Sequence, residues 1–145
     1  MPLALEHRQP IAVPPAQVFP LLIEPRTWKT WWPAVADARA KDFKPLREGS
    51  TFEVTLQLGR LTGTIRPRVA FCADGKSVVW EGRWLGVPLR QEWFLEPRPD
   101  GSRAVFRSRF TGAGTAFLRL FRLDRRWQRM LEEQARGLKK LAERI

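Results

Sequence analysis

The sequence predicts an α+β domain in which a curved antiparallel sheet of about seven strands wraps around one long C-terminal helix, with two short helices near the start. Three observations lead to this prediction. Apolar and polar residues alternate through much of positions 51–110, as they do in half-buried strands. The dipeptides Asp74-Gly75 and Asp100-Gly101 mark hairpins, which join antiparallel strands. Toward the C-terminus, the apolar residues recur with a helical period instead.

The first strand is expected from about Leu3 to Val13, and a pair of prolines ends it because proline cannot donate to a β-ladder. Pro15 suits the first turn of a short helix over residues 16–22. Pro20 is expected early enough in this helix to be tolerated in a first turn.

A second short helix is expected between Pro25 and Pro33. Trp28, Trp31 and Trp32 lie within it at the i, i+3, i+4 spacing of one helical face. Either these rings line or cover a cavity mouth, or they pack as core against the long helix.

The hairpin region begins with a strand over residues 51–58, in which every second residue is apolar. The next strand is expected to run unbroken through 61–71, with Ile65, Val69 and Phe71 on one apolar face. The remaining strands are expected at about 77–85, at 89–95, and from the Gly101 turn to about Phe110.

The long helix is expected to begin at Thr115, whose hydroxyl suits an N-cap, and to continue to the end of the chain. At 100° per residue, one arc of this helix is apolar and the opposite arc is basic. The apolar arc comprises Phe117, Leu120, Phe121, Trp127, Leu131, Ala135, Leu138, Ala142 and Ile145.

The composition bounds the class of protein. The 145 residues suit one domain, 1–145, and can build a core without a disulfide or metal. Cys72 is the only cysteine, which fits a reducing cytoplasm. The N-terminus does not read as a signal peptide, and no apolar run reaches bilayer length. We therefore expect a cytoplasmic protein, and the sequence leaves monomer and homodimer open.

The order of these elements resembles the helix-grip fold of the START/Bet v 1-like (SRPBCC) superfamily, and more narrowly its polyketide cyclase/dehydrase and lipid-transport family. The resemblance extends over nearly the whole chain, although no catalytic motif of the family is recognisable. It lies in the segments Ile11–Phe19, Trp28-x-x-Trp31-Trp32-Pro33, Gly49-x-x-Phe52, Trp80, Gly86, Trp93-x-Leu95-x-Pro97, the Gly101 hairpin and Leu138–Glu143.

The resemblance implies a hydrophobic small-molecule ligand, such as a lipid, quinone or polyketide, in a cavity between the sheet and the long helix. The alternation of the strands adds candidate residues for the wall of such a cavity. Trp80 and Trp84 share one strand face, and Trp93 shares a face with Gln91 on the neighbouring strand. Ser108 falls among apolar neighbours on the last strand, so Ser108 and Gln91 either orient a ligand or satisfy each other.

Asp124 is the sharpest polar anomaly, because it interrupts the apolar arc that contains Phe117, Phe121 and Trp127. A carboxylate that faced an apolar cavity would hold a polar ligand group or transfer protons, whereas one paired with an arginine would be structural. Asp124 or Glu92 would serve the alternative function, a cyclase or dehydratase that works through a cavity carboxylate. Gln134 also lies in the arc.

The net charge of +11 leaves a third function open. The outer arc of the long helix carries many arginines, with Leu118 expected to be exposed among them, so this face contacts an anionic membrane or is only solvated. Nucleic acid is the less favoured partner, because no recognised nucleic-acid motif is present. With His7 as the only histidine and one cysteine, we expect no metal site, and we expect no cofactor. The basic arc comprises Arg119, Arg122, Arg126, Arg129, Lys140 and Arg144.

Overall fold

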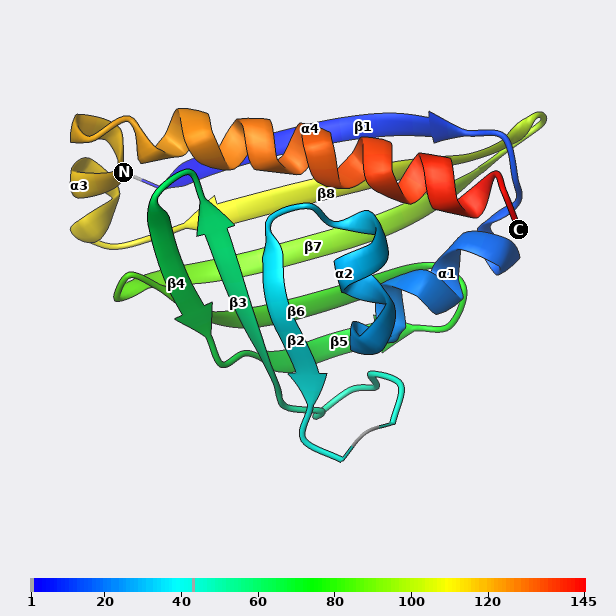
Figure 1. The fold of residues 1–145 in the computed structure, drawn as a ribbon, viewed down its shortest axis with the longest axis horizontal. Coiled ribbons are helices and arrows are strands. Elements are labelled where there is room, and N and C mark those ends of the chain that lie inside the picture. The colour runs from blue at the N-terminus through cyan, green and yellow to red at the C-terminus, as the bar shows by residue number, and fades with distance from the viewer. Residues whose placement is uncertain (1, 43) are drawn as a thin grey trace.

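Two antiparallel sheets and one long helix make up most of the molecule, which a computed structural model describes at residues 2–42 and 44–145 (Figure 1). The predicted α+β fold is confirmed. The elements are β1 (Leu3–Ile11), α1 (Pro15–Ile23), the 3-10 helix η1 (Pro25–Thr27), α2 (Trp28–Trp31), β2 (Val35–Ala40), β3 (Phe52–Leu58), β4 (Leu61–Ile65), β5 (Arg68–Ala73), β6 (Ser77–Trp84), β7 (Val87–Arg98), β8 (Gly101–Phe110), α3 (Gly114–Leu120) and α4 (Leu123–Ala142).

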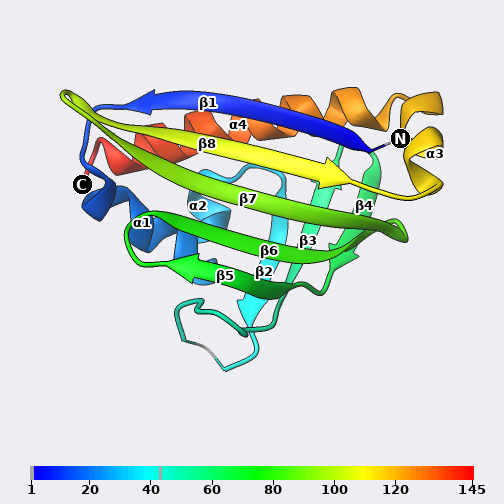
Figure 2. The ribbon, with the colours of Figure 1, turned by 180° about the vertical axis from the view of Figure 1, so that it is seen from behind.

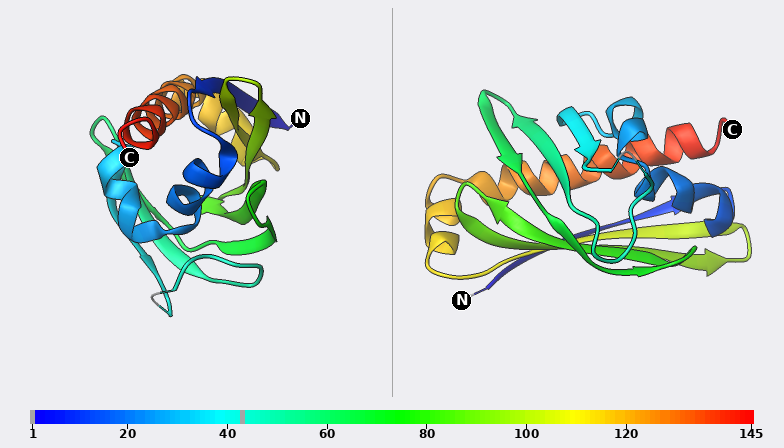
Figure 3. Two further views of the ribbon diagram at one scale, coloured as in Figure 1. Left: turned by 90° about the vertical axis from the view of Figure 1, so that its right-hand side faces the viewer. Right: turned by 90° about the horizontal axis from the view of Figure 1, so that it is seen from below.

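The strands form two sheets. The larger has the order β1-β8-β7-β6-β5, as Figure 2 shows, and the smaller has the order β2-β3-β4. A bridge between Thr51 and Arg68 connects their edges. In the end-on view of Figure 3, the sheets, the short helices and α4 surround an interior. All seven tryptophans are buried there. Within the described residues, no helix has the length and apolar character needed to cross a bilayer.

The unbroken strand expected at 61–71 is wrong, because Pro67 divides it. β4 ends at Ile65 and pairs with β3, whereas β5 begins at Arg68 and pairs with β6. Proline offers no N–H to continue a ladder, so the chain changes sheet at this point. A register shift between Val69 and Phe71 then breaks the alternation, and it leaves Phe71 on the surface instead of on the apolar face.

The prediction of a single long C-terminal helix is also wrong for the first part of that helix. Arg122 adopts a left-handed conformation with φ of 58°, which ends α3 and starts α4 in a new direction. The break changes which residues of the first part face inward, so Leu118 is buried although it was expected to be exposed. Thr115 does not cap the helix. It lies inside α3, and its hydroxyl donates to the Gly112 carbonyl at 2.9 Å.

The two short helices form where the prolines predict them. Pro15 begins α1, and Pro25 begins the turn that continues into α2. Pro20, however, lies in the second turn of α1 and not in the first.

A close backbone contact fixes where α4 lies relative to α2. A β-carbon added at Gly137 would lie 1.7 Å from the carbonyl oxygen of Trp31, so only glycine lets the two helices approach this closely. The contact joins the backbone of α4 to the backbone of α2, the helix that carries the tryptophans. The distance between α4 and α2 therefore depends on Gly137.

We expect Gly137→Ala to lower the free energy of unfolding by about 1–3 kcal/mol, because the added methyl group must displace the Trp31 carbonyl. The sign is informative, since alanine normally stabilises a helix interior by about 1 kcal/mol relative to glycine. Urea denaturation measures the difference. Arg136→Ala, at the exposed neighbouring position, should change stability by less than about 0.5 kcal/mol. A more stable Gly137→Ala protein would contradict the close contact.

Candidate functional site

The inner face of the larger sheet carries one polar row. Strand register places Trp80 opposite Gln91, Gln91 opposite Ser108, and Ser108 opposite Leu5, across β6, β7, β8 and β1. Gln91 and Ser108 are completely buried, as the alternation of their strands predicts. The sequence therefore located this polar row correctly within an otherwise apolar face.

A hydrogen-bond chain connects the polar row to α4. The Ser108 hydroxyl donates to Oε1 of Gln91 and accepts from the indole Nε1–H of Trp127 at 2.8 Å. The Trp127 ring also packs against Trp84 at 4.8 Å and against Phe110 at 5.2 Å between ring centroids. Ser108 and Gln91 thus satisfy each other in part, and Ser108 also holds α4 against the sheet.

The Trp93 side chain is the centre of an aromatic cluster that joins α2 to the sheet. Its ring contacts those of Trp28, Trp31 and Trp32, with centroid distances of 5.3, 6.3 and 5.6 Å, mostly edge to face. It also contacts Trp80 at 5.7 Å. The three α2-region tryptophans are thus inside the molecule, where they are part of the core.

Several polar atoms of this interior have no hydrogen-bond partner among residues 2–42 and 44–145. Both amide atoms of Gln134 on α4 are unpaired, although the side chain is completely buried. Most buried polar groups in proteins are paired, because an unsatisfied group costs about 1–3 kcal/mol. Most of the unpaired buried atoms of the described residues are hydrogen-bond donors, and the one acceptor among them is Gln134 Oε1. The donors are the Nε1 atoms of Trp80, Trp84 and Trp93 and the Nε2 atoms of Gln91 and Gln134.

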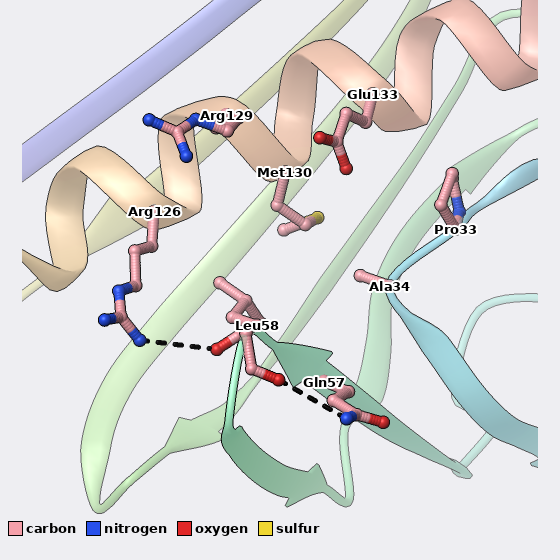
Figure 4. A pocket seen from close by; sticks show the side chains of 9 residues that line it. Pro33, Ala34, Gln57, Leu58, Arg126, Arg129, Met130 and Glu133 are labelled. Atoms are coloured by element: carbon pink, nitrogen blue, oxygen red, sulfur yellow. Dashed lines mark hydrogen bonds between the residues drawn. The ribbon is translucent and has the colours of Figure 1, made fainter.

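A groove of about 390 Å³ opens between α4 and the end of β3 (Figure 4). Met130 projects from α4 toward Leu58, and both side chains are buried. Arg126 reaches across the groove, where its Nη1 donates to the Leu58 carbonyl at 3.5 Å. Behind the groove, the Trp32 indole N–H lies 2.9 Å from the Met130 sulfur. Pro33, Ala34, Gln57, Gly59, Arg129 and Glu133 complete the lining.

Met130 therefore separates the groove from the tryptophan cluster. Its side chain is unbranched and flexible, so it can change rotamer more readily than the rings behind it. The groove combines an apolar base with a charged rim, and its volume lies in the lower part of the range of small-molecule sites. It lies between the end of β3, in the smaller sheet, and the long helix.

The structure brings most of the predicted site residues together but not all of them. Phe117 and Phe121 were expected on the inner arc, and this is wrong, because they lie on the surface beside the helix break. Asp124 is half-buried in the first turn of α4, and its Oδ1 accepts the backbone N–H of Arg125 at 2.9 Å. The residues that lie inside together are Trp28, Trp31, Trp32, Trp80, Trp84, Gln91, Trp93, Ser108 and Trp127.

Two kinds of residue were missed by sequence reasoning. The sequence pattern could have identified Gln134, because this polar residue lies in the apolar arc one turn after Met130. It was not among the predicted site residues. No sequence pattern identifies the groove residues Ala34, Leu58 and Arg126, because they come from three segments that only the folded chain brings together.

Ionisable groups are absent from the buried part of the described chain. Glu92 lies on the outer face of β7 opposite Arg107, and its neighbours Gln91 and Trp93 point inward. Burial raises the pKa of the half-buried Cys72 thiol, and Asp74 and Glu48 raise it further, so the thiol stays protonated at neutral pH. The interior thus offers neutral hydrogen-bonding groups.

We expect Ser108→Ala to lower the free energy of unfolding by about 1–3 kcal/mol, because Trp127 Nε1 and Gln91 Oε1 both lose their partner. Chemical denaturation measures the loss. Ser50→Ala, in the loop before β3, removes a hydroxyl that accepts one exposed backbone N–H, and it should cost clearly less. Equal stability of Ser108→Ala and the wild type would contradict the role of this hydroxyl.

Comparison with solved structures supports the fold. The Zhui aromatase/cyclase from Streptomyces sp. R1128 superposes with a TM-score of 0.83 at 14% identity, over 99% of this chain and 95% of that chain. Ara h 8.0201 gives a TM-score of 0.69 at 11% identity over the full length of both chains. The di-domain aromatase/cyclase StfQ gives 0.74 at 20% identity, over 98% of this chain and 49% of that chain.

No curated protein matches the chain. A family profile described as polyketide cyclase/dehydrase and lipid transport matches residues 2–143. The match extends over nearly the whole sequence. The chain belongs to the polyketide cyclase/dehydrase and lipid transport family.

Proposed function

We propose that this protein binds a hydrophobic small molecule that carries carbonyl or other acceptor oxygens, in the interior between the larger sheet and α4. The observation that carries the proposal is the set of buried donors without acceptors. A ligand oxygen would satisfy such a donor, and the surrounding rings would contact the apolar part of the ligand. A quinone or a polyketide-like molecule fits this chemistry better than a hydrocarbon chain does.

The position of the donors supports one site. Trp80 and Gln91 face each other across β6 and β7, so their free N–H groups belong to the same polar row. The Trp93 ring contacts the Trp80 ring, which puts a third free donor nearby. The groove at Met130 supplies the entry in this proposal, and entry requires Met130 and the Trp32 ring behind it to move.

Binding is favoured over the cyclase or dehydratase alternative that would act through a carboxylate. Asp124 binds the N–H of the residue that follows it, and Glu92 faces outward. The buried polar side chains of the described residues are neutral serine, threonine and glutamine. Such groups orient a ligand by hydrogen bonds, but they do not accept or release a proton near neutral pH.

The first test is native mass spectrometry of freshly purified protein, with organic extraction of any bound molecule. We expect a small apolar molecule with oxygen acceptors. Calorimetric titration with an anthraquinone and with a saturated fatty acid then compares the two ligand chemistries, and the quinone should bind more tightly. A bare mass with no binding of either probe would mean that side chains alone fill the interior, and the proposal would fail.

Gln134→Leu separates a ligand-binding role from a structural one. The change removes an unpaired buried amide, so the free energy of unfolding should rise by about 1 kcal/mol or more. Quinone affinity should fall about tenfold if a ligand uses the amide. Calorimetry and urea denaturation measure the two effects.

Gln128→Leu on the same helix is the matched control, because the Gln128 amide is already paired with the Glu6 carbonyl at 3.1 Å. This variant should lose stability and keep its quinone affinity. If Gln134→Leu keeps its affinity as well, Gln134 does not contact the ligand.

A further inference from the structure

Three large apolar side chains project from the corner where α3 meets α4. Phe117, Leu120 and Phe121 are 47%, 77% and 58% exposed, and the two phenylalanine rings pack together at 4.8 Å. We call these three residues the α3 patch. Large apolar residues scattered singly on a surface need no explanation, but three in one helical turn do.

The α3 patch sits on an anchored element. Thr115 and Leu118 on the other side of α3 are buried. The start of the helix packs on the sheet, since a β-carbon at Gly114 would lie 2.6 Å from Cγ2 of Val87. The left-handed Arg122 then turns the chain into α4. The fold therefore holds the three side chains in solvent at one end of the molecule, as Figure 1 shows for α3.

Cations surround the α3 patch. Arg119, Arg122, Arg125 and Arg126 are exposed in the same corner, and none of them forms an ion pair with any described residue. Some arginines elsewhere on the surface are paired, as Arg103 is with Glu96 at 2.9 Å, whereas others, such as Arg136, form no ion pair with a described residue. The one carboxylate between residues 111 and 126 is Asp124, which is half-buried.

We propose that the α3–α4 corner docks on an anionic lipid bilayer, with the α3 patch inserted among the headgroups and the four arginines on the lipid phosphates. Rigid aromatic and aliphatic side chains beside unpaired cations match the membrane interface, where apolar groups and anionic headgroups lie within a few ångströms of each other. Nucleic acid would use the arginines but would leave Leu120 and the two phenylalanines in water.

Docking would also orient the groove. Arg126 belongs both to this corner and to the lining of the groove beside Met130. A protein held at the corner would therefore keep one wall of the groove close to the lipid surface, from which an apolar ligand could enter. This last consequence rests on the proposed function, whereas membrane docking does not.

Vesicle co-sedimentation tests the proposal on the full chain without any ligand. The vesicles are phosphatidylcholine alone and phosphatidylcholine with an equal part of phosphatidylglycerol. The wild type should bind the anionic vesicles, with binding that weakens as salt is added. Phe117→Ser with Leu120→Ser and Phe121→Ser should lose at least about tenfold in partitioning, since about 0.8 kcal/mol is lost per buried CH2 group removed. Arg119→Glu with Arg125→Glu should also lose about tenfold or more, at about 1 kcal/mol per charge.

Phe71→Ser is the matched control, because Phe71 is 49% exposed on β5, away from α3 in Figure 1. It should bind like the wild type, and thermal denaturation should show all variants folded. Absence of wild-type binding would overturn the proposal. So would full binding by the serine variant, because net charge alone would then explain it. A serine variant that instead shifts a monomer–dimer equilibrium, measured by light scattering, would identify a self-association face and also overturn membrane docking.

Discussion

The packing around Trp93 is the interaction on which the rest of the structure depends. This ring, on the central part of the larger sheet, contacts all three tryptophans of the α2 region and Trp80 on the neighbouring strand. The short helices have few residues and little helical stability of their own, so tertiary packing must hold them. Through Trp93 they become part of the core, and α4 then packs on them at the Gly137 contact.

The same interior combines dense aromatic packing with unpaired polar atoms. A core chosen only for stability would replace Gln134 and Gln91 with apolar residues, because a buried amide without a partner costs free energy. Ser108 resolves part of this cost by joining Gln91 to Trp127, and it leaves the Gln91 Nε2 donor free. Sites where local packing rules are broken are often functional, which is why the proposal of ligand binding rests on these atoms and not on the tryptophans alone.

The strand alternation placed Trp80, Gln91, Trp93 and Ser108 correctly, because period two assigns each residue of a paired strand to one face. The helical period was correct for Trp127 and the later residues of α4. It failed for Phe117, Leu120 and Phe121, since periodicity assumes one continuous helix and the Arg122 turn changes its direction. It also failed for Ile145, which is exposed beyond the end of α4 at Ala142. Phe71 failed for a similar reason, because a bulge shifts the register of β5.

The sequence by itself determined the α+β class, the positions of the Asp-Gly hairpins and the short helices, and the family resemblance, because prolines, Asp-Gly turns and hydrophobic periods are local signals. Tertiary structure alone decided the division into two sheets at Pro67, the groove at Met130 and the exposed corner at α3. Each of these depends on contacts between segments distant in the chain or on one backbone conformation. Local signals carry no information about such contacts, since burial and pairing are set only when the distant segments meet.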